Sequence, residues 1–84
     1  MYTVVVKKKA LKELDAVPKK YYTALRDTID GLAENPRPAG CKKLTGADNH
    51  YRIRVGTYRI LYTIEDNVLT IIVVKVAHRK DAYS

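Results

Sequence analysis

Hydrophobic and polar residues alternate along the segment Tyr51–Tyr62, which reads Tyr-Arg-Ile-Arg-Val-Gly-Thr-Tyr-Arg-Ile-Leu-Tyr. Alternation with period two is typical of a strand that buries one face, and Gly56-Thr57 in the middle of this segment predicts a turn. The segment is therefore predicted to form a hairpin of two strands. One face of the hairpin is apolar, and the other carries Arg52, Arg54 and Arg59.

Helical spacing replaces this alternation in the first third of the chain. A short β-branched run at Tyr2–Val6 predicts a strand, and apolar residues at helical spacing follow it from Lys8 to Val17. Pro18 ends that helix and can open a second one, whose apolar stripe runs from Tyr21 to Ala33. The second helix is expected to end before Asn35-Pro36, because a residue that precedes proline disfavours helical geometry.

The remaining segments complete an α+β fold. Pro36–Asn49 is predicted to be a loop because it holds two prolines and two glycines, and Glu65–Asn67 is predicted to be a turn. Leu69–Ala77 is almost wholly apolar, as expected of a strand that is covered on both faces or lies at the centre of a sheet. The predicted order is β-α-α-β-β-β, with a helical hairpin packed on one side of a small, mostly antiparallel sheet.

Composition limits the class of protein. The 84 residues suit a single domain spanning 1–84, and no apolar run is long enough to predict a membrane span. No secretory signal is recognisable, and a single cysteine cannot form an internal disulfide, so a cytoplasmic location is expected. The net charge of +7 favours an anionic partner such as a nucleic acid.

Basic side chains from three predicted strands form the candidate site. Guanidinium groups match phosphate with two parallel hydrogen bonds and stay charged at neutral pH, so several on one face can hold a phosphodiester and stabilise extra charge in a transition state. An aromatic ring at the edge of the site can stack on an unpaired base. The candidate residues are Arg52, Arg54, Arg59, Lys75 and Arg79, followed by His78, Lys80 and Tyr83, with Lys42 and Lys43 as further RNA-binding cations.

Other catalytic motifs are missing from the sequence. We find no histidine or cysteine cluster with metal-ligand spacing, no glycine-rich phosphate loop and no nucleophile triad, and we expect neither a metal nor another cofactor. A basic face of this kind can still cleave RNA, because the 2′-hydroxyl is a nucleophile already placed beside its target phosphorus. DNA lacks this hydroxyl and would not be cleaved in this way.

The chain resembles, over its whole length, the RelE branch of the RelE/ParE toxins of toxin–antitoxin systems. The resemblance depends on the segments Ala10–Leu14, Asn35-Pro36, Lys42–Leu44 with Gly46, the hairpin Tyr51–Tyr62, and Val76–Arg79 followed by Tyr83. It implies a metal-independent endoribonuclease that cleaves mRNA in the A site of the small ribosomal subunit and so inhibits translation. It also implies an acidic antitoxin that wraps the toxin, and operator DNA bound only through that complex.

The resemblance also implies roles for single residues. Arg52 and Arg54 match two basic residues, often lysines, that contact the phosphate, and Arg59 matches an arginine that stabilises the transition state. Arg79 matches a second arginine near the scissile group, and Tyr83 matches a tyrosine that orients the substrate nucleotide. Arginine at positions 52 and 54 is a departure from the family pattern, because arginine is a poor general acid or base at neutral pH.

The sequence therefore leaves open which group transfers protons and which function the chain has. His78, Tyr83 and groups of ribosomal RNA are the candidates for proton transfer. Two alternatives to the nuclease stay open: a ParE-type inhibitor of DNA gyrase, and a relative without catalysis that only binds RNA or its antitoxin.

Overall fold

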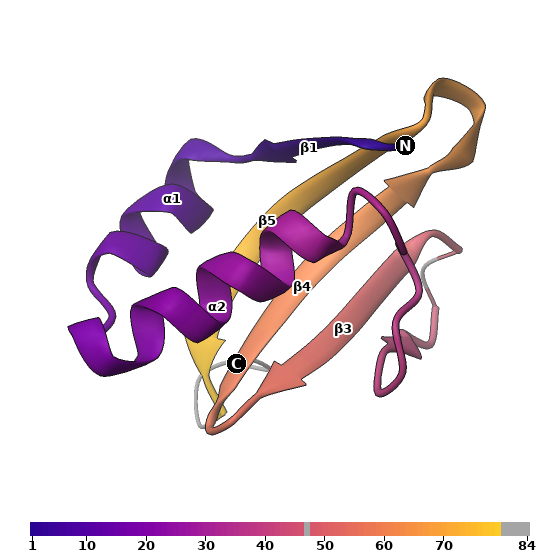
Figure 1. Ribbon diagram of the computed structural model, residues 1–84. Helices are drawn as coiled ribbons and strands as arrows, with labels where there is room; N and C mark the ends of the chain where they lie inside the picture. Colours follow the sequence, from indigo (N-terminus) through magenta and orange to yellow (C-terminus); the bar gives the residue numbers. More distant parts are fainter. Residues whose placement is uncertain (47, 80–84) are drawn as a thin grey trace.

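Residues 1–46 and 48–79 are described by the computed structural model, and this part of the chain forms an open sheet with two helices (Figure 1). The elements follow the predicted order. They are β1 (Thr3–Val6), α1 (Lys8–Asp15), α2 (Lys19–Gly31), β2 (Lys42–Lys43), β3 (His50–Val55), β4 (Tyr58–Glu65) and β5 (Thr70–His78), with a short 3-10 turn at Asp66–Val68 between the last two strands.

The sheet is mostly antiparallel, as predicted. Its strand order is β1-β5-β4-β3-β2, and β1 pairs with β5 in parallel whereas the other neighbours are antiparallel. The apolar strand β5 thus lies between β1 and β4. Ile71, Val73 and Val76 of this strand are buried in the core, which accounts for part of its apolar sequence.

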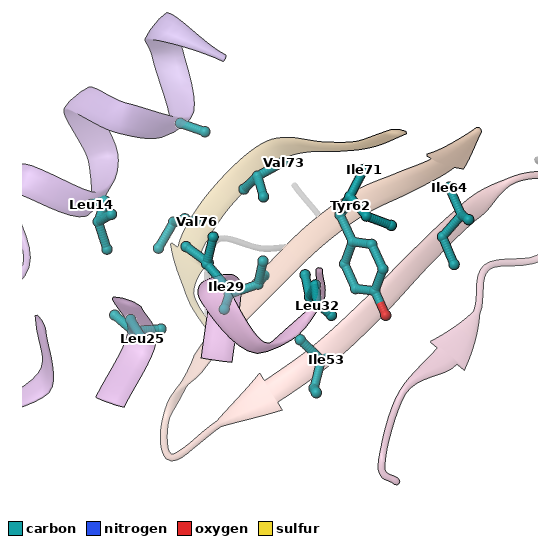
Figure 2. Packing of buried hydrophobic residues seen from close by; sticks show 12 residues of the cluster. Leu14, Leu25, Ile29, Leu32, Ile53, Tyr62, Ile64, Ile71, Val73 and Val76 are labelled. Carbon is teal, nitrogen blue, oxygen red and sulfur yellow. The ribbon is translucent and has the colours of Figure 1, made fainter. Parts of the chain in front are cut away.

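Both helices cover the same face of the sheet (Figure 1). Ala10 and Leu14 of α1 and Leu25 and Ile29 of α2 are buried against the sheet, as their helical spacing predicts. The strands complete the core from the same face (Figure 2). Their buried core side chains are Ile53, Ile60, Tyr62, Ile64, Ile71, Val73 and Val76. Within residues 1–46 and 48–79, no helix covers the opposite face of the sheet, and we call this face the arginine face after Arg52, Arg54 and Arg59.

The helix ends differ slightly from the prediction. Pro18 is the residue just before α2 rather than its first helical residue, and its extended backbone reverses the chain between the helices. The helix α2 ends at Gly31, four residues before Asn35-Pro36, where the prediction had placed its limit. The last residues before that proline instead form a tight turn, in which the Asn35 N–H donates to the Gly31 carbonyl.

Strand β2 lies inside the segment predicted as a loop, and this part of the prediction was wrong. Lys42 and Lys43 pair with Arg52 and Tyr51 of β3. Two lysines give no hydrophobic alternation, so the sequence held no sign of a strand. Backbone hydrogen bonding to β3 forms this edge strand, and charged edge strands resist pairing with other chains.

A polar cluster ties together four distant segments at the end of the molecule near the β4–β5 turn. The Tyr2 hydroxyl donates to Asp66 at 2.6 Å, and Arg37 pairs with the other carboxylate oxygen at 3.0 Å. The Arg37 Nε donates to the Tyr51 hydroxyl at 3.3 Å, and its guanidinium lies 5.3 Å from the centroid of that ring. The Tyr2 and Arg37 hydrogen bonds lower the pKa of Asp66.

No helix in the described ranges is long and apolar enough to span a lipid bilayer.

Candidate nucleic-acid interface

The hairpin of β3 and β4 brings two arginines directly opposite one another. Arg54 pairs with Arg59 across the two strands, and Arg59 pairs with Ala77 of β5 on its other side. Directly opposed residues lie on the same face with Cβ atoms about 5 Å apart. Arg54 and Arg59 therefore lie side by side on one face of the sheet, as the alternation along the chain predicted.

A second row of basic residues lies beside the first on the arginine face. Arg52 pairs with Leu61 of β4 and, on its other side, with Lys42 of β2. Leu61 pairs in turn with Lys75 of β5. The residues Lys42, Arg52 and Lys75 thus come from three strands and share this row. Lys43 occupies the opposite register position beside Tyr51, on the face that the helices cover.

Two of these arginines are buried, which the sequence did not predict. Arg52 and Arg59 each keep only 9% of their surface exposed, whereas Arg54 is exposed. Arg59 Nη1 donates to the Tyr58 carbonyl at 3.2 Å, and Arg59 Nε is buried with no hydrogen-bond partner within the described residues. Burial of a guanidinium is costly unless charge or hydrogen bonds compensate it, so this position is suited to an anionic ligand.

Carboxylates do not neutralise the arginine pair in the described part of the chain. The ion pairs found there join Arg26 to Asp30 and Arg37 to Asp66, both away from the Arg54–Arg59 pair. Like charges directly opposite each other in a sheet are destabilising by several tenths of a kcal/mol. The arrangement therefore costs stability and strengthens the local positive potential.

Arg79 follows the end of β5 at the same end of the sheet. Its backbone N–H donates to the Thr57 carbonyl at 2.7 Å, which holds it beside the turn between β3 and β4. Its side chain is exposed. The turn places Arg79 close to the strand ends that carry Arg54 and Arg59, as the site hypothesis requires.

His78 does not join the arginines. It pairs with Tyr58, whose side chain packs against the core, and the two rings meet edge to face with centroids 5.6 Å apart. His78 also lines an open pocket of about 370 Å³ together with Glu13. Its register position is on the helix side of the sheet, opposite in parity to Arg59. Two other candidates, Lys80 and Tyr83, lie outside the described residues.

His50 shares the arginine face instead, and the sequence interpretation had given it no role. It stands two residues before Arg52 on β3 and pairs with Thr63 of β4. Its parity could have been read from the sequence, because positions 50, 52 and 54 alternate onto one face of a strand. The signal was missed because the predicted hairpin began at Tyr51, one residue after His50.

Comparison with known proteins agrees with this architecture. Residues 4–83 match the family model described as ParE toxin of type II toxin-antitoxin system, parDE. Toxin RelE3 of Methanocaldococcus jannaschii is 38% identical, with 95% of this chain and 93% of the relative covered. Toxin RelG of Mycobacterium tuberculosis is 31% identical, with coverage of 98% and 95%.

A solved structure gives the same result in three dimensions. The archaeal RelE–RelB complex from Pyrococcus horikoshii contains a chain that superposes with a TM-score of 0.84 at 30% identity, covering 96% of this chain and 98% of its own. Sequence and fold thus agree over nearly the full length. The chain belongs to the RelE/ParE family of type II toxin–antitoxin toxins, and it resembles the RelE branch.

Proposed function

We propose that this toxin is a metal-independent endoribonuclease that cleaves mRNA in the A site of the small ribosomal subunit. The main support for this proposal is the opposed pair Arg54–Arg59, with Arg52 beside it and Arg79 at the adjoining strand end. These cations on one face of the sheet match a phosphodiester, and the kinship with RelE toxins supports a role in growth control. Translating ribosomes would place this action in the cytoplasm.

The proposed reaction uses the RNA's own 2′-hydroxyl as the nucleophile. The hydroxyl oxygen attacks the adjacent phosphorus, a 2′,3′-cyclic phosphate forms, and the 5′-oxygen of the next nucleotide leaves with a proton. Arg54 and Arg59 would offset the added negative charge on the phosphoryl oxygens, and Arg79 would stabilise the leaving group. Preorganised cations of this kind are among the strongest sources of rate enhancement.

The arginines of this site provide no good general acid or base, and this lack supports a requirement for the ribosome. Guanidinium groups exchange protons poorly at neutral pH. His78 faces the helix side, so we assign it no part in the reaction. We assign the proton transfers to Tyr83 and to ribosomal RNA groups at the decoding site. Free RNA is then expected to be cleaved slowly.

An antitoxin is the second proposed partner. The similar solved structure from Pyrococcus horikoshii is a RelE–RelB complex, which supports a RelB-like partner for this chain. An acidic antitoxin that wraps the toxin would neutralise the exposed positive charge of the arginine face. Operator DNA would then be bound through the complex rather than by this chain.

The product of the reaction tests the proposal. Purified ribosomes programmed with a defined mRNA are incubated with the toxin, and the fragments are analysed for their 3′ ends. We expect cleavage within the A-site codon and a 2′,3′-cyclic phosphate, and we expect a single 2′-deoxy nucleotide at the cleaved position to block it. Cleavage of the deoxy substrate at the normal rate would contradict the mechanism.

Two other outcomes would replace the nuclease with another function. The matching family model is named for ParE toxins, so inhibition of DNA gyrase in a supercoiling assay, without mRNA cleavage, would favour a gyrase inhibitor. Tight RNA or antitoxin binding without any cleavage product would favour a binding protein that lacks catalysis.

A further inference from the structure

We propose that His50 and Thr63 form a nucleobase-binding subsite beside the arginines. The subsite would hold one base of the RNA whose phosphate is bound by Arg54 and Arg59, so it rests on the proposed function. Three observations favour a nucleobase as the ligand: the position of the subsite, the residues around it and its two polar side chains.

The position follows from the register of the hairpin. His50, Arg52 and Arg54 lie on the same face of β3, and each two-residue step covers about 6.8 Å. Thr63 lies opposite His50 just as Arg59 lies opposite Arg54. An extended RNA that follows β3 away from the Arg54–Arg59 pair would pass Arg52 and then reach His50.

The row that contains His50 is mostly apolar. Thr63 pairs with Ile72 of β5, and Ile72 pairs with Val5 of β1, whose side chain is 46% exposed. On the other side the Leu44 N–H donates to the His50 carbonyl at 2.8 Å, so Leu44 extends the same row. None of these five residues is a lysine or an arginine. A flat base with apolar faces fits this row better than a second phosphate does.

The two polar side chains supply the means to recognise a base edge. His50 Nδ1 and Thr63 Oγ1 are both buried, and neither has a hydrogen-bond partner in residues 1–46 and 48–79. Thr63 is only 7% exposed, and a buried polar group without a partner lowers stability. Such a cost is expected where the group serves a ligand.

A small rotation of the Thr63 side chain when RNA binds would let the Thr63 hydroxyl and His50 Nδ1 form a hydrogen bond with each other. Cβ atoms of opposed residues lie about 5 Å apart, so the Thr63 hydroxyl can turn to donate to His50 Nδ1. That hydrogen bond fixes the imidazole tautomer that carries its hydrogen on Nε2. Since Nδ1 is the buried nitrogen, Nε2–H is the donor left to meet an acceptor on the base, while the ring provides a stacking surface.

Binding of a non-cleavable RNA tests this subsite without any need for catalysis. The probes are fluorescent 2′-O-methyl RNA trinucleotides that carry either a full set of bases or one abasic position, measured by anisotropy at low salt. In the wild-type chain, we expect removal of one particular base to weaken binding about tenfold. In His50→Ala we expect this penalty to fall below twofold. In Thr63→Val, which keeps the imidazole ring for stacking, we expect the penalty to lie between the His50→Ala and wild-type values.

Two further variants separate a subsite from general damage. Arg26→Ala removes a positive charge from α2, outside the interface, and should keep the full tenfold penalty. His50→Phe keeps a stacking ring but loses the donor, so its penalty should lie between the wild-type and His50→Ala values. Thermal unfolding curves check that each variant is folded, and Thr63→Val is chosen because it preserves side-chain shape.

The results distinguish failure of the subsite from failure of the nuclease. An equal abasic penalty in wild type, His50→Ala and Thr63→Val, or no penalty in the wild type, would overturn the subsite while mRNA cleavage could still be observed. If removal of a base weakens binding in a His50-dependent way but the chain never cleaves mRNA, the subsite is supported and the nuclease function is contradicted.

Discussion

Arg54 and Arg59 illustrate at the scale of single residues how this chain gives up stability for charge. A sheet gains most from opposite charges or apolar groups at directly opposed positions, yet here two guanidinium groups share one pair. Arg59 is also 9% exposed and its Nε is without a partner among the described residues. Local disagreement with the rules of stability is a common mark of a functional position.

Asp66 is a residue at which charge stabilises the fold instead. The Tyr2 hydroxyl and the Arg37 guanidinium lower the pKa of its carboxyl group in the folded chain. A carboxyl group with a depressed pKa contributes stability above its unfolded pKa, and this contribution is lost as the pH falls through the folded value. The window lies below about pH 4, since a free aspartate titrates there.

The variant Asp66→Asn tests this link. We expect its melting temperature to be lower than that of the wild type at pH 6, and the difference to shrink steadily as the pH falls below about 4. Asp27→Asn is a matched control in α2, because the described residues provide Asp27 with no ion pair, and it should follow the wild type. If the difference in melting temperature between the wild type and Asp66→Asn stays constant down to pH 2, the assignment is contradicted.

At the scale of elements, periodicity predicted most of the fold. The strand β5 and both helices follow from runs of residues whose spacing matches one regular structure, such as Ala10 and Leu14 or Leu25 and Ile29. Two features left no such pattern. The strand β2 consists of two lysines paired with β3, and the β4–β5 register shifts between Leu61 and Tyr62.

The positions of the candidate site residues on the sheet were also partly predictable. Parity along the hairpin placed Arg52, Arg54 and Arg59 on one face, and the register confirms it. Parity alone could not show that two of them are buried, because burial depends on the whole tertiary arrangement. His78 was a candidate at the end of the last strand, and the register places it on the face opposite to the arginines.

The turn between β3 and β4 fixes the register that opposes Arg54 to Arg59. Gly56 has a φ of +60°, and a Cβ placed there would meet no atom within 4 Å, so the constraint comes from the backbone alone. Left-handed geometry costs an ordinary residue about 1–2 kcal/mol. We expect Gly56→Ala to lower the free energy of unfolding by about 1 kcal/mol in urea denaturation.

Gly31 provides the matched control for this variant. It ends α2 without a positive φ, and its added Cβ also meets nothing within 4 Å. Alanine favours helix over glycine by up to about 1 kcal/mol, so Gly31→Ala should leave stability unchanged or raise it. Equal losses of stability in both variants would show that the turn conformation is not the cause.

At the scale of the whole molecule, the sheet divides two tasks. One face packs against both helices and holds the core (Figures 1 and 2). The other face carries cations from several strands. The net charge of +7 adds a long-range attraction for polyanions that salt would weaken. Under the proposed function, the core face supports the fold and the arginine face binds RNA, so we expect substitution of the exposed Arg54 to change activity without unfolding the chain.

The single-turnover rate of mRNA cleavage on programmed ribosomes tests most directly whether the arginine face acts on RNA. Arg59→Ala is expected to reduce the rate by about 10²–10³-fold, because it removes a preorganised cation from the reacting phosphate. Arg26→Ala makes the same change of charge on α2 and is expected to cleave at the wild-type rate. Equal rates for Arg59→Ala and Arg26→Ala, with both variants folded, would contradict the account.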